Sequence, residues 1–140
     1  SRAQACQILY NIADVSDVLT ENEFDDVRSG MWYTDAIGWA AAQNIVSGYG
    51  DGSFGPDDSI TREQMAAILY RYAGLPNASS EALKNYTDAA QISPWAYKAL
   101  NWCVDNDIMV GNGDGTIAPS TTIIRAEAAA MLMRYVGIEG

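Results

Sequence analysis

Three arginines hold the same place in a sequence that repeats itself. Arg2, Arg62 and Arg125 stand in the segments SRAQ, TREQ and IRAE, each at the opening of an apolar helical pattern. Because a helix start carries partial positive charge, a cation at that position is unfavourable. Its presence in all three copies suggests that the arginine has a function. A guanidinium beside unpaired N–H groups would bind an anion such as a carboxylate or a phosphate. The alternative is a salt bridge to a neighbouring acid such as Asp26 or Asp88.

Composition narrows the classes of function. The 140 residues include 18 acids, 8 bases and no histidine, for a net charge of −10. Such a charge argues against nucleic acid or an anionic membrane as a partner. The lack of histidine removes the commonest general base and zinc ligand, and no cofactor or metal is predicted. No run of 18 apolar residues occurs, so direct membrane insertion is not expected.

The chain contains an internal repeat. Residues 32–74 align with residues 95–137 at a constant offset, with matching tryptophans, glycines, isoleucines and arginines. Residues 1–13 align with residues 61–73, which makes a partial first copy. We therefore predict one domain, with the closing half of a first repeat at 1–23, a second repeat at 24–85 and a third at 86–140. Since Ser1 begins inside a helical pattern, we expect the chain to be a piece of something larger.

Each repeat is predicted to be helix–loop–helix. The first helix should cover about residues 32–43 and 95–106, and the closing helix starts at Thr61, whose segment TREQ has the form of a capping box. Apolar residues at helical spacing follow in all three copies: Ala5, Ile8, Leu9, Ile12; Met65, Ile68, Leu69, Tyr72; and Ala128, Met131, Leu132, Tyr135. Three such helices of equal length predict an all-α fold around a pseudo-threefold three-helix core.

A glycine-rich loop joins the two helices of each repeat. GYGDGSFGP and GNGDGTIAP lack the ligand spacing of a calcium loop and the lysine of a phosphate loop. Both loops fit a chain reversal in which glycines supply positive φ.

Four tryptophans form two matched pairs. Core packing is the more common role for such residues, although proteins also use an exposed aromatic face to bind sugar rings. Trp39 and Trp102, nearer the glycine loop, are the better candidates for ligand contact, whereas Trp32 and Trp95 look structural. Trp32 and Trp39 are seven apart, which would put them on one helix face.

The stretch from Phe24 to Arg71, with FDDV, then GYGDGSFGPDDSITREQ and an apolar helix, resembles an S-layer homology repeat. Residues 86–137 carry most of the same pattern, and residues 1–13 resemble a closing helix. The resemblance implies a spindle or trimer of repeats at the bacterial cell wall, extracellular, without catalysis. Its ligand would be a secondary cell-wall polysaccharide, typically pyruvylated, or modified peptidoglycan, bound in grooves between repeats.

The resemblance also implies the binding residues. Its arginine maps onto Arg2, Arg62 and Arg125, and its aspartate onto Asp26 and Asp88. The implied loop residues are Gly48, Gly50, Asp51, Gly52, Gly111, Gly113, Asp114 and Gly115. The last copy has Ile124 in place of the capping hydroxyl, so the site at Arg62 ranks above that at Arg125. The first repeat lacks its front half, which a neighbouring chain could complete.

Two other classes of function remain open. The grooves could receive subunits of a surface lattice, which would make the chain an assembly module. An enzyme would need a carboxylate pair such as Asp51 with Asp57 or Asp58, and the last two align with Ser120 and Thr121 in the other copy. The two cysteines, Cys6 and Cys103, lie in helical patterns and are expected to be buried free thiols rather than a disulfide.

Overall fold

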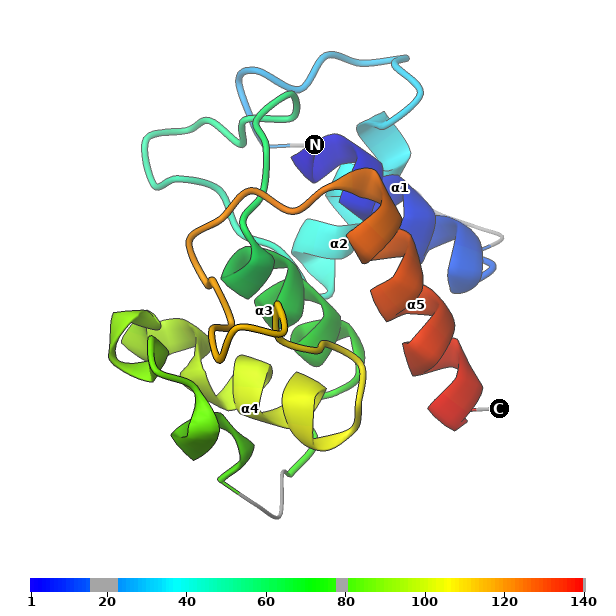
Figure 1. The fold of residues 1–140 in the computed structure, drawn as a ribbon. Coiled ribbons are helices and arrows are strands. Elements are labelled where there is room, and N and C mark those ends of the chain that lie inside the picture. Colours follow the sequence, from blue (N-terminus) through cyan, green and yellow to red (C-terminus); the bar gives the residue numbers. More distant parts are fainter. Residues whose placement is uncertain (16–22, 78–80, 140) are drawn as a thin grey trace. The chain divides into compact units, whose positions relative to one another are not determined.

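The computed structural model describes residues 1–15, 23–77 and 81–139 (Figure 1). Its α-helices are α1 (Arg2–Ile12), α2 (Thr34–Ala42), α3 (Arg62–Tyr72), α4 (Tyr97–Asp105) and α5 (Arg125–Glu139). Short 3-10 helices, η1 (Ala82–Asn85), η2 (Ala89–Gln91) and η3 (Pro94–Ala96), precede α4. Within the described ranges there is no strand, only an isolated bridge between Thr61 and Thr122. The prediction of an all-α fold with repeated units is confirmed.

The chain divides into two compact units, unit 1 (Ser1–Ser59) and unit 2 (Ile60–Gly140). In unit 1, α1 packs on α2, and in unit 2, α3 packs on α4 (Figure 1). Each unit thus joins the closing helix of one repeat to the opening half of the next. The pseudo-threefold core would need helices of both units, so it stays a prediction, as do the repeat boundaries. None of the described helices is long and apolar enough to cross a membrane.

Two of the closing helices begin with a capping box. Thr61 accepts a hydrogen bond from the N–H of Gln64, and the Gln64 side chain accepts one from the N–H of Thr61, as predicted. Ser1 and Gln4 form the same arrangement at α1. The expected equality of length is wrong, because α5 has 15 residues whereas α1 and α3 have 11 each.

The core of each unit is apolar, and it includes the cysteines. Met65, Ile68 and Leu69 of α3 are buried as predicted, whereas Ile8 and Ile12 of α1 are each 40% exposed, so only part of the α1 stripe is buried. Cys6 and Cys103 are buried free thiols, as expected. Burial raises the pKa of both to about 12, so they stay protonated near neutral pH.

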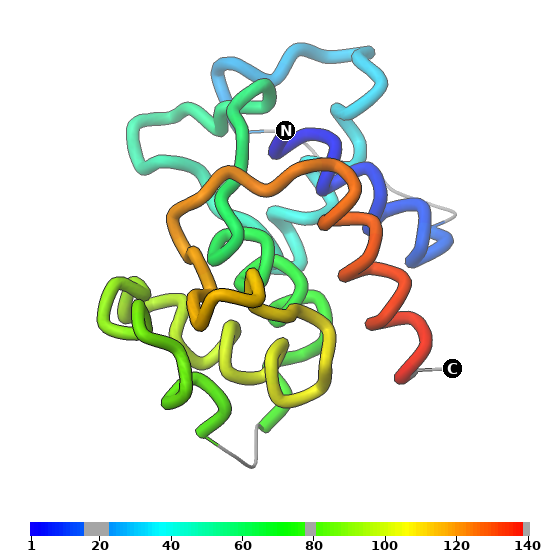
Figure 2. Tube along the Cα trace, viewed as in Figure 1, coloured from blue at the N-terminus to red at the C-terminus, as the bar shows by residue number. Residues whose placement is uncertain are grey.

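The glycine loops return the chain to the start of a helix (Figure 2). Residues 44–59 follow α2 and run past the first turn of α1, and residues 106–124 follow α4 and run past the first turn of α3. The glycines Gly50, Gly52, Gly113 and Gly115 have φ between 86° and 92°, which confirms the predicted positive φ. This return brings together the residues that the sequence singled out.

Candidate functional site

The N–H groups at two helix starts are already hydrogen-bonded to loop carbonyls. In unit 1 the N–H of Arg2 donates to the carbonyl of Asp58 at 2.9 Å, and the N–H of Ala3 donates to that of Pro56 at 2.9 Å. In unit 2, the N–H groups of Arg62 and Glu63 donate to the carbonyls of Thr121 and Pro119 at 2.9 and 3.0 Å. The prediction that unpaired N–H groups form an anion site is therefore wrong at these two helices, because the loop satisfies them.

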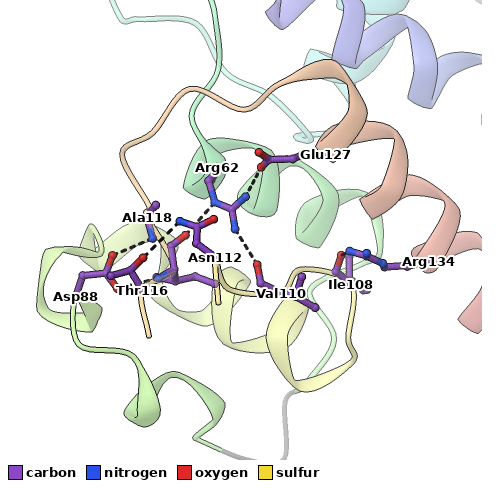
Figure 3. Close-up of polar contacts among 10 residues, drawn as sticks. Arg62, Asp88, Ile108, Val110, Asn112, Thr116, Ala118, Glu127 and Arg134 are labelled. Atoms are coloured by element: carbon purple, nitrogen blue, oxygen red, sulfur yellow. Dashed lines mark hydrogen bonds and ion pairs between the residues drawn. The ribbon is translucent and has the colours of Figure 1, made fainter. Parts of the chain in front are cut away.

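The arginine side chains hold the same loops. In unit 1, Nε of Arg2 donates to the carbonyl of Phe54 at 2.9 Å and Nη2 donates to that of Ser47 at 2.7 Å. In unit 2, Nε and Nη2 of Arg62 donate to the carbonyls of Ile117 and Val110, both at 2.9 Å (Figure 3). We call this arrangement, repeated in both units, the arginine clamp.

Both clamp arginines are buried, with exposed fractions of 8% for Arg2 and 5% for Arg62. A buried guanidinium must be hydrogen-bonded, and the loop carbonyls provide that. Each arginine therefore fixes a loop to a helix start.

The two aspartates hold the other side of the loops. Asp26 accepts the N–H groups of Phe54 and Gly55, both at 2.8 Å. Asp88 accepts those of Ile117 and Ala118 at 2.9 and 2.8 Å (Figure 3). In the described part of the chain, neither aspartate pairs with an arginine, so Asp26 and Asp88 are wrong as partners. The alternative of a salt bridge to a neighbouring acid is nevertheless met at Arg62, which pairs with Glu127.

These bonds shift the acidity of Asp26. Desolvation would raise its pKa, but the N–H groups of Phe54 and Gly55 outweigh this and lower the pKa below the ordinary 3.8. The carboxylate of Asp26 is thus a structural acceptor that stays charged.

The loop aspartates act within their own turns. Asp51 accepts the hydroxyl and the N–H of Ser53, and Asp114 accepts the same groups of Thr116. Hydrogen bonding from these hydroxyls, and next from the N–H groups, lowers the pKa of both carboxyls. Among the described residues, no group of three or more histidines, cysteines or acids lies together as a metal site would require.

Gly48 and Gly111 are needed for space rather than for positive φ. A Cβ at Gly48 would lie 2.5 Å from Cε1 of Phe24 and 2.8 Å from the carbonyl oxygen of Ser53. A Cβ at Gly111 would lie 2.5 Å from Cε1 of Tyr86 and 2.8 Å from the carbonyl oxygen of Thr116. The expectation of positive φ at Gly48 is therefore replaced by close packing.

The assignment of the tryptophans is corrected. Trp39 is 9% exposed and packs edge-on against Tyr10, while Trp102 is 5% exposed and contacts Tyr70 and Tyr135. These rings belong to the core and present no broad face to a sugar. Trp32 and Trp95, expected to be structural, are instead 58% and 55% exposed.

Two residues that the sequence interpretation missed distinguish the units. Glu127 of α5 pairs with Nη1 of Arg62 (Figure 3). Tyr49 donates to Asp58 at 2.6 Å, and its ring lies 4.8 Å from the guanidinium carbon of Arg2. The signal for Glu127 was present, because IRAE has glutamate where TREQ and SRAQ have glutamine.

The third repeated arginine has no such clamp. Arg125 is exposed at the first residue of α5, and no described residue accepts a hydrogen bond from its guanidinium. The structure thus brings Arg2 and Arg62 to glycine loops, and it does not bring Arg125 to one.

The clamp, the paired aspartate and the close-packed glycine occur together twice in the same order along the chain. The sequence profile of the S-layer homology domain matches residues 23–66 and 85–129, which contain both aspartates, both glycine loops and Arg62, whereas Arg2 lies before the first match. The chain belongs to the S-layer homology family. Relatives of this chain are named as surface-layer and cell-surface proteins, and the family places the domain at the cell surface.

Relatives of this S-layer homology domain are much longer proteins. It is 34% identical over 135 residues to an amylopullulanase of Thermoanaerobacterium thermosulfurigenes, covering 94% of the chain and 7% of the relative. It is 32% identical to a cellulosome-anchoring protein of Acetivibrio thermocellus (79% and 25% covered). It is 30% identical to a surface-layer 125 kDa protein of Lysinibacillus sphaericus (97% and 12% covered). The chain therefore spans a quarter or less of these relatives, of which the first is an enzyme by name.

Proposed function

We propose that this S-layer homology domain is a non-catalytic anchor that binds an acidic, pyruvylated secondary cell-wall polysaccharide. The observation that carries the proposal is the buried guanidinium of the arginine clamp. In unit 2 that guanidinium takes a carboxylate, that of Glu127. A pyruvyl ketal offers a carboxylate of the same kind on a sugar ring, and charge-assisted hydrogen bonds to a guanidinium are among the stronger polar contacts.

Binding of this kind is local and weak at each site. The chain carries a net charge of −10, which repels an anionic polymer at long range. A polysaccharide presents many copies of the same sugar, so several chains on one polymer gain avidity without any new contact.

Calorimetric titration of the domain with isolated wall polysaccharide tests the proposal. We expect binding to pyruvylated polysaccharide and at least an about tenfold loss with the chemically depyruvylated polymer, because the ion pair to the guanidinium is removed. Equal affinity for both polymers would refute the role of the carboxylate.

A protein-assembly module of a surface layer is the alternative, favoured by the surface-layer proteins among the relatives. Binding to modified peptidoglycan is a variant of the anchoring proposal. A neighbouring chain that supplies a glycine loop to the exposed Arg125 would favour assembly. Sedimentation velocity of the domain alone separates these cases, since an assembly module self-associates without any glycan.

A further inference from the structure

The glycine loop of unit 2 contains a dipeptide that the loop of unit 1 lacks. Asn112 precedes Gly113, and it is the only asparagine in the sequence that is followed by a glycine. In unit 1 the matching residues are Tyr49 and Gly50. The two loops are otherwise built alike, because Gly113 and Gly50 both have positive φ, 86° and 90°. The units therefore differ at this place in the reactivity of one side chain.

An asparagine followed by a glycine can react with its own main chain. The main-chain nitrogen of the glycine attacks Cγ of the asparagine, so that an N–Cγ bond forms, the Cγ–Nδ2 bond breaks and Nδ2 leaves as ammonia with the proton of the attacking N–H. The attack is intramolecular and is therefore favoured by proximity. Water then opens the five-membered succinimide at either carbonyl, which leaves aspartate or isoaspartate. The reaction consumes one water and releases one ammonia, and it needs no oxidant or reductant.

The structure leaves the attacking nitrogen accessible. No described residue accepts a hydrogen bond from the N–H of Gly113. A Cβ placed at Gly113 would have no heavy atom within 4 Å, so the surroundings of this residue are open. A glycine also has the widest range of main-chain conformations, which eases the rotation that ring closure requires. Neither hydrogen bonding nor crowding therefore protects the main chain at Gly113.

The side chain of Asn112 is exposed and weakly held. Its Nδ2 donates to Oγ1 of Thr116 at 3.4 Å, which is longer than an ordinary N–H···O hydrogen bond (Figure 3). The hydroxyl of Thr116 itself donates to Asp114 at 2.6 Å. The amide of Asn112 is thus free to turn toward the main-chain nitrogen of Gly113.

The reaction would change a segment that Arg62 holds at both ends. Nη2 and Nε of Arg62 take the carbonyls of Val110 and Ile117, and position 112 lies between them. An isoaspartate adds one carbon to the main chain within this span. It also places a new carboxylate near that of Asp114, and like charges close together repel each other. Both changes oppose the geometry of the clamp.

We propose that Asn112 is a site of spontaneous modification, and that its conversion to isoaspartate loosens the arginine clamp of unit 2 and spares that of unit 1. Tyr49 has no amide group, so the loop of unit 1 cannot react in this way. The inference goes beyond the proposed anchoring function and does not depend on which ligand the domain binds.

Two other asparagines serve as internal controls. Asn44 is followed by Ile45, whose branched side chain obstructs the attack and whose N–H already donates to the carbonyl of Ala40 at 2.9 Å. Asn106 is followed by Asp107, which also carries a side chain. Peptide mapping by mass spectrometry measures the conversion at all three positions in one sample.

The test is incubation of the intact chain in neutral and in mildly alkaline buffer. We expect Asn112 to convert about tenfold or more faster than Asn44 and Asn106, and faster in the alkaline buffer because the attacking nitrogen must lose its proton. By NMR, a new Nε–H signal of Arg62 should grow at the rate at which position 112 converts, while the Nε–H signal of Arg2 stays unchanged.

Two variants separate the reaction from general ageing of the sample. In Asn112→Gln a less favourable six-membered ring would be needed, so the Arg62 signal should stay constant throughout the incubation. Tyr49→Asn places an asparagine before Gly50 and should transfer the reaction to unit 1. The Arg2 signal should then change with time relative to the fresh variant.

Either step can be refuted by itself. If Asn112 converts no faster than Asn44 and Asn106, it is not a modification site. If it converts while the Arg62 signal and the hydrogen exchange of the Ile117 and Ala118 amides stay the same, the clamp tolerates the longer main chain and the loosening is wrong. A change at Arg62 that also appears in Asn112→Gln would have another cause, which would equally overturn the proposal. None of these results bears on the anchoring function, which the polysaccharide titration tests.

Discussion

At the scale of single residues, the side chains that the sequence suggests as ligand contacts also stabilise the fold. Asp26 and Asp88 each accept two loop N–H groups, and Arg2 and Arg62 each donate to two loop carbonyls. An exposed aspartate that holds two backbone donors stabilises the loop through charge-assisted hydrogen bonds. Any contact that these side chains make with a ligand would therefore be in addition to their hydrogen bonds within the fold.

Asp26→Asn should lower the free energy of unfolding at pH 7 by about 1 kcal/mol, because a neutral amide accepts the two N–H groups less strongly. The pKa of Asp26 is lowered in the folded chain, so its stabilisation is present above the unfolded pKa and lost as pH falls through the folded pKa. Urea unfolding at a series of pH values from 7 downward should therefore show the wild type and variant converging only as the pH falls below the ordinary carboxyl pKa of 3.8.

Asp25→Asn is the matched control, since it removes the same charge one residue away, and the N–H groups of Phe54 and Gly55 donate to Asp26 rather than to Asp25. A loss as large as that of Asp26→Asn would mean that net charge, rather than the two hydrogen bonds, causes the effect.

At the scale of secondary-structure elements, the features that the sequence predicts correctly depend on residues close together in the chain. The capping box at Thr61 and the closing helices follow from residues three or four apart, and a reader of the sequence sees these directly. The carbonyl acceptors of Arg62 lie about 50 residues away and are main-chain atoms, which carry no residue identity. The repeated position therefore predicts that Arg62 has a specific role, but the sequence does not identify the main-chain atoms that Arg62 contacts.

The prediction that Trp32 and Trp39 share one helix face was wrong for a related reason. Their seven-residue spacing implies one face only if both stand in the same helix. The helix α2 begins at Thr34, so Trp32 lies before it and points independently of Trp39. A two-residue error in a helix boundary thus removed the basis for placing the two rings on one helix face.

The glycine loops give a prediction at this scale. Gly111→Ala should lower the free energy of unfolding by about 1–3 kcal/mol, because the new methyl group meets both the Tyr86 ring and a main-chain oxygen that cannot easily move. Gly137→Ala, in α5, meets nothing within 4 Å and should be neutral or stabilising by up to about 1 kcal/mol. Chemical denaturation measures both, and a tolerated Gly111→Ala would show that the loop can shift away from Tyr86.

At the scale of the whole molecule, the division into two units sets how a local change spreads. Each unit holds its own clamp, its own aspartate and its own glycine loop, and none of these bonds crosses between Ser59 and Ile60. Segments with separate hydrogen-bond networks commonly open with separate free energies. The arginine clamp at Arg2 should therefore be sensitive to damage in unit 1 and insensitive to damage in unit 2.

Native-state hydrogen exchange tests this separation. In Gly48→Ala, the amides of Phe54 and Gly55 should exchange faster by roughly tenfold or more, while those of Ile117 and Ala118 change little, because the substitution strains the loop of unit 1 alone. Gly111→Ala should give the reverse pattern. If either substitution accelerates both pairs of amides equally, the two units open as one cooperative structure.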